Sequence, residues 1–171
     1  MNEYSGQQKK LLECNAIKNF ILEFNRTHIK KILLKELIER HGIPDTHCYL
    51  NGNDLWVEVV HSYGTNIEAA VRLDNRNISD YPEKIQKKHR IIPVNIRAIN
   101  SLNQRLFDKS KKNYIVQPVW LLVRNGFTLW GKRDYINNRT SIIIPPRHPF
   151  QKIWLLCDQH SIGAPGIIRL A

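Results

Sequence analysis

The chain has 171 residues and a mass of 20.1 kDa, which is the size of one ordinary domain. Apolar residues make up 42% of it and charged residues 24%, so a packed core can form and global disorder is excluded. Lys and Arg number 26 against 15 Asp and Glu, which gives a formal net charge of +11. This excess favours a polyanionic partner, nucleic acid in the first place. The alternative is a charge that only keeps the protein dispersed.

Other classes of protein are disfavoured by simple patterns. No apolar run approaches the roughly 18 residues of a membrane span, and the first residues lack the charged start and apolar centre of a signal peptide. The three cysteines, Cys14, Cys48 and Cys157, are odd in number and form no CxxC pair. They therefore disfavour a disulfide framework or a structural zinc site and favour a reducing, cytoplasmic compartment. We expect no membrane partner.

Two helices are predicted in the first quarter of the chain. Residues 8–24 carry apolar side chains at the i, i+3, i+4, i+7 spacing of one buried helix face: Cys14, Ile17, Phe20, Ile21 and Phe24. Thr27 can cap a second helix that runs to about His41. Gly42 and Pro44 then end it.

A hairpin of two strands is predicted next. Residues 47–51 form a short strand, and Asn51-Gly52-Asn53 has the composition of a hairpin turn. Residues 54–61 are apolar on both sides, which is typical of a central strand covered on both faces. In this strand Leu55, Val57 and Val59 point one way, and Trp56, Glu58 and Val60 point the other.

The rest of the chain predicts alternating helices and strands. A short helix is expected over 66–73 and a longer one from Val94 or Asn95 to Asn113, with Ile99, Leu102 and Leu106 on its apolar face. Strands are expected over 119–124, 153–158 and 166–170, with a long loop before the second. This order predicts one domain, residues 1–171, of the α/β (α+β) class, with a mixed sheet flanked by helices.

Glu58 is the most informative residue. A carboxylate in a strand buried on both faces costs several kcal/mol, about the penalty of an unpaired buried charge, unless it is paired, protonated or bound to metal. Asp45 lies thirteen residues earlier, and the hairpin between them can bring the two carboxylates together. Such a pair is the oxygen-rich site that Mg²⁺ or Mn²⁺ prefers. Alternatively, Asp45 is a turn residue after Pro44, and Glu58 pairs with a Lys or Arg.

Glu36 is a further acidic candidate. In the predicted second helix it lies four residues after Ile32 and seven after Ile29, on their core-facing side. An acid there would face the same region as the strands that follow. The alternative is a solvated helix edge.

Together these residues resemble a known family. A helix with Glu36, then Ile43-Pro44-Asp45, then the strand 55–60 with Glu58 is similar to the PD-(D/E)XK nuclease core, over roughly residues 28–124. The resemblance implies a restriction-endonuclease-like sheet and metal-dependent hydrolysis of DNA phosphodiester bonds. It divides the domain into an N-terminal helix (1–25), a nuclease-like core (26–124) and a basic loop with C-terminal strands (125–171).

One departure from the family pattern concerns its lysine, which would fall at Val60. His61 is adjacent, but strand alternation points it away from Glu58 unless the strand ends or bulges there. Lys109 lies on the apolar stripe of the later helix, from which it could reach the carboxylates, and Gln104 resembles the accessory glutamine of some members. The resemblance thus implies Asp45, Glu58, Lys109, His61 and Gln104 as catalytic residues, and Asp45, Glu58 and Glu36 as metal ligands. For Lys109 and Gln104 the alternative is a solvated side chain.

Basic side chains gather in two segments that fit a nucleic-acid partner, DNA before RNA. Those expected to contact phosphates are Lys84, Lys87, Lys88, Arg90, Arg105, Lys111 and Lys112. Two other functions stay open: an inactive nuclease-fold module that binds nucleic acid, and a basic protein-interaction factor with an exposed apolar patch. The choice between a monomer and a homodimer also stays open.

Overall fold

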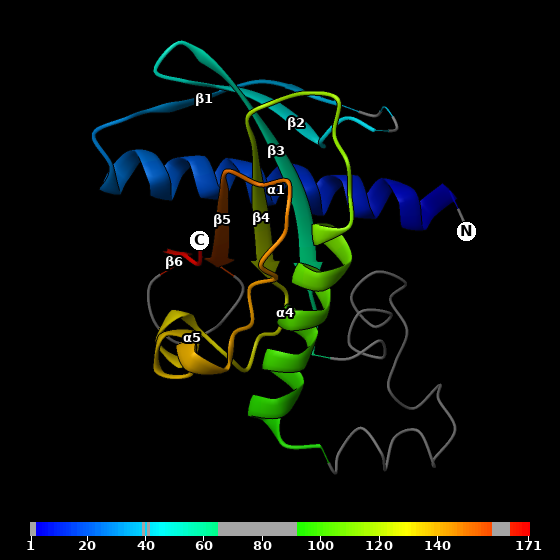
Figure 1. Ribbon diagram of the computed structural model, residues 1–171, viewed down its shortest axis with the longest axis vertical. Helices are drawn as coiled ribbons and strands as arrows, with labels where there is room; N and C mark the ends of the chain where they lie inside the picture. Colours follow the sequence, from blue (N-terminus) through cyan, green and yellow to red (C-terminus); the bar gives the residue numbers. More distant parts are fainter. Residues whose placement is uncertain (1–2, 39, 41, 65–91, 159–164) are drawn as a thin grey trace.

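Six strands and three α-helices make up the described part of the chain (Figure 1). The computed structural model describes residues 3–38, 40, 42–64, 92–158 and 165–171. In chain order the elements are α1 (Glu3–Thr27), β1 (Ile32–Leu37), β2 (Thr46–Leu50), β3 (Asn53–Ser62), α4 (Val94–Ser110), β4 (Val119–Asn125), α5 (Lys132–Asn137), the 3-10 turn η2 (Arg139–Ser141), β5 (Lys152–Cys157) and β6 (Gly166–Arg169). The predicted α/β class is therefore confirmed.

The strands form one open mixed sheet in the order β1-β2-β3-β4-β5-β6. The first three strands are an antiparallel meander, β3, β4 and β5 are parallel, and β6 is antiparallel to β5. Parallel neighbours need a crossover connection, and α4 belongs to the one between β3 and β4. The central strands therefore come from distant parts of the chain.

The hairpin between β2 and β3 follows the predicted turn. Asn51 and Gly52 have φ angles of 49° and 85°, and two successive positive values are typical of a type I′ turn. The turn joins Leu50 to Asn53, and the register continues without interruption to Thr46 opposite Val57. This two-residue connection sets which side chains of the two strands are neighbours.

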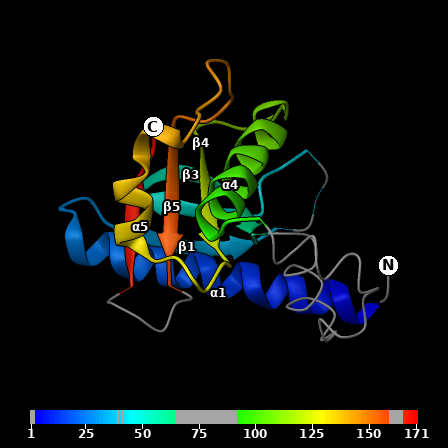
Figure 2. The ribbon, with the colours of Figure 1, turned by 90° about the horizontal axis from the view of Figure 1, so that it is seen from below.

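Helices cover both faces of the sheet (Figure 2). On the α1 face, Leu55 and Val57 of β3 are buried in one cluster with Ile17, Phe20 and Phe24 of α1. On the opposite face, Leu102 and Leu106 of α4 and Tyr135 of α5 belong to a second cluster, against which Trp56 and Val60 pack. The predicted alternation along β3 is confirmed, and Glu58 shares the α4 face with Trp56 and Val60.

The predicted second helix is wrong, because residues 32–37 form β1. The strand begins where Asn25 holds Ile32 by two hydrogen bonds, one to its carbonyl oxygen and one from its N–H. Lys31 and Asn51 are likewise joined by two hydrogen bonds, and β1 then pairs with β2. Pairing with a distant segment thus overrides a local sequence that suits a helix.

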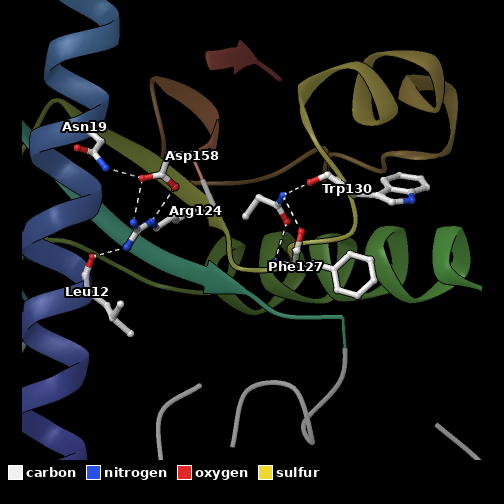
Figure 3. Close-up of polar contacts among 7 residues, drawn as sticks. Leu12, Asn19, Arg124, Phe127, Trp130 and Asp158 are labelled. Carbon is white, nitrogen blue, oxygen red and sulfur yellow. Dashed lines mark hydrogen bonds and ion pairs between the residues drawn. The ribbon is translucent and has the colours of Figure 1, made fainter. Parts of the chain in front are cut away.

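The later elements agree with the prediction with two differences. α4 ends at Ser110 rather than Asn113, and α5 with η2 occupies part of the predicted long loop. Asn125, at the end of β4, is fully buried and organises the start of that segment by donating to the carbonyl oxygens of Phe127 and Trp130 (Figure 3). The predicted helix 66–73 lies outside the described residues.

A buried ion pair fixes α1 to the ends of β4 and β5 (Figure 3). The Arg124 guanidinium donates to both oxygens of Asp158 at 2.9 Å, and the two side chains are 4% and 3% exposed. From α1, Asn19 donates to Asp158 at 2.6 Å, and the Leu12 carbonyl accepts from Arg124 at 3.1 Å. The charges are thus paired and hydrogen-bonded, as burial requires.

Two further findings concern the predicted class. No helix within the described ranges is long and apolar enough to cross a membrane. All three cysteines are free, and burial raises the pKa of the Cys48 and Cys157 thiols to about 12.

Asp158→Asn should destabilise the protein strongly, because it leaves the buried Arg124 charge without its counter-charge. Removal of one partner of a buried pair costs about 3–5 kcal/mol, and we expect a loss near the lower value because Asn still accepts a hydrogen bond. Urea unfolding followed by tryptophan fluorescence measures it. Asp108→Asn, which changes an exposed carboxylate on α4, is the control and should stay within about 0.5 kcal/mol of wild type. Equal stability of the two variants would contradict the role of the pair.

Candidate functional site

Asp45 lies immediately before β2, beside the middle of β3. Its carboxylate accepts a hydrogen bond of 2.7 Å from the Val59 N–H, and its carbonyl accepts one of 2.8 Å from Ile38. Because Thr46 pairs with Val57 in an antiparallel ladder, the next position outward places Asp45 opposite Glu58. The hairpin brings the two carboxylates together as predicted.

Glu58 lies in β3 on the α4 face and is 7% exposed. Lys109, from the last turn of α4, donates to Glu58 Oε1 and forms an ion pair with it. The Lys109 side chain is 20% exposed, so the pair lies at the margin of the core. The prediction that Lys109 reaches the carboxylates is confirmed. The same contact also agrees with the alternative, in which Glu58 is a buried acid paired with a lysine.

The electrostatics of Asp45 reflect its place between burial and a second acid. Burial first, and then the Glu58 charge, raise the pKa of Asp45 to about 7. The Val59 N–H and the Lys109 ammonium oppose this shift without cancelling it. Near neutral pH a substantial share of Asp45 is therefore protonated, although Lys109 is bound to its neighbour Glu58.

A third carboxylate, Glu13 of α1, lies within electrostatic range and was not predicted. Burial raises the pKa of Glu13, Lys9 at 3.5 Å opposes the shift, and the charges of Lys109 and Glu58 also act on it. A signal in the sequence could have identified it. Glu13 precedes Ile17 by four residues and Phe20 by seven, so it belongs to the buried stripe of α1.

Tyr114, which follows α4, places a phenol beside the same carboxylates. Its hydroxyl is buried and makes no well-formed hydrogen bond with a described residue. It is close enough to Glu58 for that charge, after burial, to raise the pKa of Tyr114. The ring packs against Phe150, with 5.9 Å between the ring centroids.

Glu36 does not join this group. It lies on β1 instead of a helix, its side chain is 56% exposed, and its carboxylate is 3.5 Å from Nδ1 of His47. The same ring contacts Asp54 at 2.6 Å and stacks on Trp56. Glu36 therefore belongs to a surface cluster across β1, β2 and β3.

His61 lies on the opposite face of β3 from Glu58. The ladder with β4 continues past it to Ser62 without a bulge, so the predicted alternation holds and His61 does not reach the carboxylates. Burial, and then the Arg124 charge, lower the pKa of His61 to about 4. It is therefore neutral at physiological pH and stacks with Tyr63.

Gln104 also lies away from the carboxylates. It is exposed on α4, and its amide donates to Asp108 at 2.8 Å. The spacing of four residues makes this a contact within the helix. A role as accessory glutamine has no geometric support.

The predicted basic residues divide into two sets. Lys84, Lys87, Lys88 and Arg90 lie outside the described residues. At the end of α4, Lys112 is exposed, and Lys111 places its ammonium 3.7 Å from the Phe107 ring centroid. Arg105 is half-buried on the same helix.

Within the described ranges, no group of three or more His, Cys, Asp or Glu side chains is arranged to hold a metal ion. The predicted ligand set of Asp45, Glu58 and Glu36 is thus reduced to the first two. Comparison of the chain with protein-family models, curated proteins and solved structures finds no match. The function therefore has to be inferred from the site itself.

Asp45→Asn should change how stability depends on pH. Folded Asp45 keeps its proton up to about pH 7, whereas in the unfolded chain it loses it near pH 4. Between these values the folded state binds more protons, so the Asp45 contribution to the free energy of unfolding falls as pH rises. Asn does not titrate, and the variant should gain on wild type by up to about 4 kcal/mol between pH 4 and pH 8.

Urea unfolding at several pH values between 4 and 8 measures this difference. Glu36→Gln, in which an exposed acid of the same sheet is changed, is the control and should follow wild type. A difference between Asp45→Asn and wild type that does not vary with pH would contradict a raised pKa of Asp45.

Proposed function

We propose that the protein is a metal-dependent nuclease that hydrolyses DNA phosphodiester bonds at Asp45 and Glu58. The observation that carries the proposal is a pair of carboxylates, the half-buried Asp45 and the buried Glu58, adjacent across β2 and β3, with Lys109 bound to Glu58. Two acids can hold a divalent ion, and a lysine beside them can stabilise the charge that develops on a phosphate, so this set of groups suits phosphodiester hydrolysis.

The arrangement of elements adds support. Among the described elements, a helix, a three-stranded meander, a further helix and a strand parallel to the third strand come in the order α1, β1, β2, β3, α4 and β4. This order is similar to that of the PD-(D/E)XK core. In this comparison α1 corresponds to the helix of the family core that precedes the hairpin. Its acid is Glu13, whereas the sequence predicted a helix at this point with Glu36.

The donor set of the site fits Mg²⁺ or Mn²⁺. Mg²⁺ keeps several waters and binds through one or two carboxylates together with substrate phosphates, so Asp45 and Glu58 would suffice. Burial and the neighbouring Glu58 charge raise the pKa of Asp45, and a divalent ion bound between the two carboxylates would offset the repulsion between them. Such an ion supplies a water of lowered pKa and neutralises charge on the phosphate.

The protein's own groups would act on the charge that develops during hydrolysis. Lys109 places an ammonium at Glu58, next to where a phosphate would lie if it were bound to an ion held by the two acids. Fixed positive charge in a partly buried site stabilises a phosphorane-like state more than it would in water. The Val59 N–H holds Asp45 in one orientation.

A second function, a nucleic-acid-binding module without activity, is favoured by one observation. Lys109 already neutralises Glu58, and the described residues bring no third ligand to the pair. In such a protein the ion pair would be a structural contact. Binding of DNA without cleavage, in the presence of either ion, would identify this class.

Plasmid and single-stranded DNA should be cleaved with Mg²⁺ or Mn²⁺ and not with EDTA. Glu58→Ala should reduce the cleavage rate by about 100-fold or more, because a ligand that positions the ion and its water is lost. Gel electrophoresis of timed samples measures the rate.

Gln104→Ala, an exposed change on α4 that leaves the carboxylates intact, is the matched control. It should cleave at the wild-type rate. Equal rates for wild type and Glu58→Ala would remove Glu58 from the mechanism. Retained DNA binding without any cleavage would leave the binding module as the function.

Mg²⁺ should also raise the midpoint of thermal unfolding at pH 8, because a ligand that binds only the folded state stabilises it. Asp45→Asn should abolish this shift, since the pair then loses a charge, whereas Glu36→Gln should preserve it. Differential scanning fluorimetry with NaCl at matched ionic strength makes the comparison. The same shift in Asp45→Asn and wild type would place the ion elsewhere.

A further inference from the structure

Arg105 is a charged residue of α4 for which the described part of the chain provides no partner. It is half-buried, its Nε is buried without a hydrogen bond, and no described carboxylate pairs with it. A guanidinium has five N–H donors and stays charged. Because buried charge is normally paired, a half-buried guanidinium without a partner among the described residues is a place where an anion can bind.

The contacts of α4 with β3 place Arg105 along the strand. Ser101 contacts the Ser62 hydroxyl at 3.0 Å, and Lys109 pairs with Glu58. The eight residue steps from Ser101 to Lys109 rise about 12 Å along the helix, and the four residue steps from Ser62 to Glu58 span about 13 Å along the strand. The helix and the strand therefore run alongside each other in opposite directions, and Arg105 lies level with Val60.

Arg105 also faces the same side as these two contacts. Ser101, Arg105 and Lys109 are spaced four residues apart, so they form one stripe along the helix. Both ends of the stripe touch β3. Val60, opposite its middle, shares the α4 face with Glu58 and has no side-chain acceptor. The backbone of Arg105 is thus one helical turn from that of Lys109, on the side of α4 that faces β3.

The charges of the site show what Arg105 adds. Lys109 is bound to Glu58, so its charge is largely balanced within the protein. No described residue balances Arg105 in this way, so it is the cation of this stripe that can pair with a ligand. Guanidinium groups bind phosphate through two parallel N–H donors, with a geometry that an ammonium lacks.

We propose that Arg105 binds a phosphate group of the substrate at the level of Val60, beside Asp45 and Glu58. The proposal rests on the proposed function for the nature of the substrate, which is a phosphodiester. Arg105 would hold the phosphate next to an ion bound by the two carboxylates and would face the charge that develops on the phosphate oxygens.

Chemical modification of wild-type protein tests the binding site without requiring activity. Phenylglyoxal modifies accessible arginines, and mass spectrometry of peptides measures the extent at each position. Inorganic phosphate should slow modification of Arg105 several-fold relative to chloride at the same ionic strength. Arg133, exposed on α5, is the internal control and should be modified equally in both salts. Equal modification of Arg105 in both salts would overturn the proposal.

Cleavage kinetics test the role in the reaction. Arg105→Gln should lower kcat/KM by about 100-fold, as loss of one preorganised donor to a developing oxyanion does. Arg105→Lys should recover part of the loss, because it restores charge without the paired donors. Lys18→Gln, which removes an exposed charge of α1, should stay within a few-fold of wild type.

The two experiments separate failure of this proposal from failure of the proposed nuclease activity. If wild type does not cleave but phosphate protects Arg105, the activity fails and the phosphate site stands. If wild type cleaves and Glu58→Ala does not, but folded Arg105→Gln matches wild type, the activity stands and the contact with the scissile phosphate fails. Circular dichroism establishes that the variants are folded.

Discussion

The register between β2 and β3 is the constraint on which the candidate site depends. A turn of two residues, Asn51 and Gly52, fixes that register because both adopt positive φ angles. Side chains alternate with a period of two along a strand, so a slip of one residue would move Glu58 to the α1 face and away from Lys109. The turn and the carboxylates lie at opposite ends of the hairpin. The chemistry of the site is therefore specified by a short segment that takes no part in it.

The acids of the site come from the β2–β3 hairpin and its cations come from α4. The hairpin supplies both acids, and Val60, two residues after Glu58, leaves the α4 face of β3 without a cation. The cations come from one stripe of α4, which the Ser101–Ser62 contact aligns with the strand. Residues one turn apart on a helix are separated by about 6 Å, and so are neighbouring residues on one face of a strand. A helix can therefore present such side chains to neighbouring positions on that face. Lys109 and Arg105 thus face adjacent positions on β3.

The parts of the site that could be predicted from sequence depend on local rules. Turn composition and strand alternation were enough to place Asp45 beside Glu58, and the apolar stripe of α4 was enough to direct Lys109 toward them. Glu36 of β1 was misplaced because residues 29–37 fit a helical stripe equally well. The strand is selected only by pairing with β2 and by the Asn25 side chain. Glu13 was missed for a related reason. Its stripe on α1 is visible in the sequence, but the distance to the hairpin is set by how a helix packs on a sheet formed from distant segments.

The packing of α1 connects the buried ion pair to the carboxylates. The Leu12 carbonyl, which accepts from Arg124, is one residue from Glu13, and Asn19 holds Asp158 two turns further along the helix. A helix held at two points by charged hydrogen bonds cannot slide along its axis without breaking them. The ion pair therefore fixes where Glu13 lies relative to Asp45, whose pKa is sensitive to its charge. Apolar packing is not directional, so an apolar contact at this point would not fix the position of α1 along its axis. The buried, charged pair of Arg124 and Asp158 does fix it.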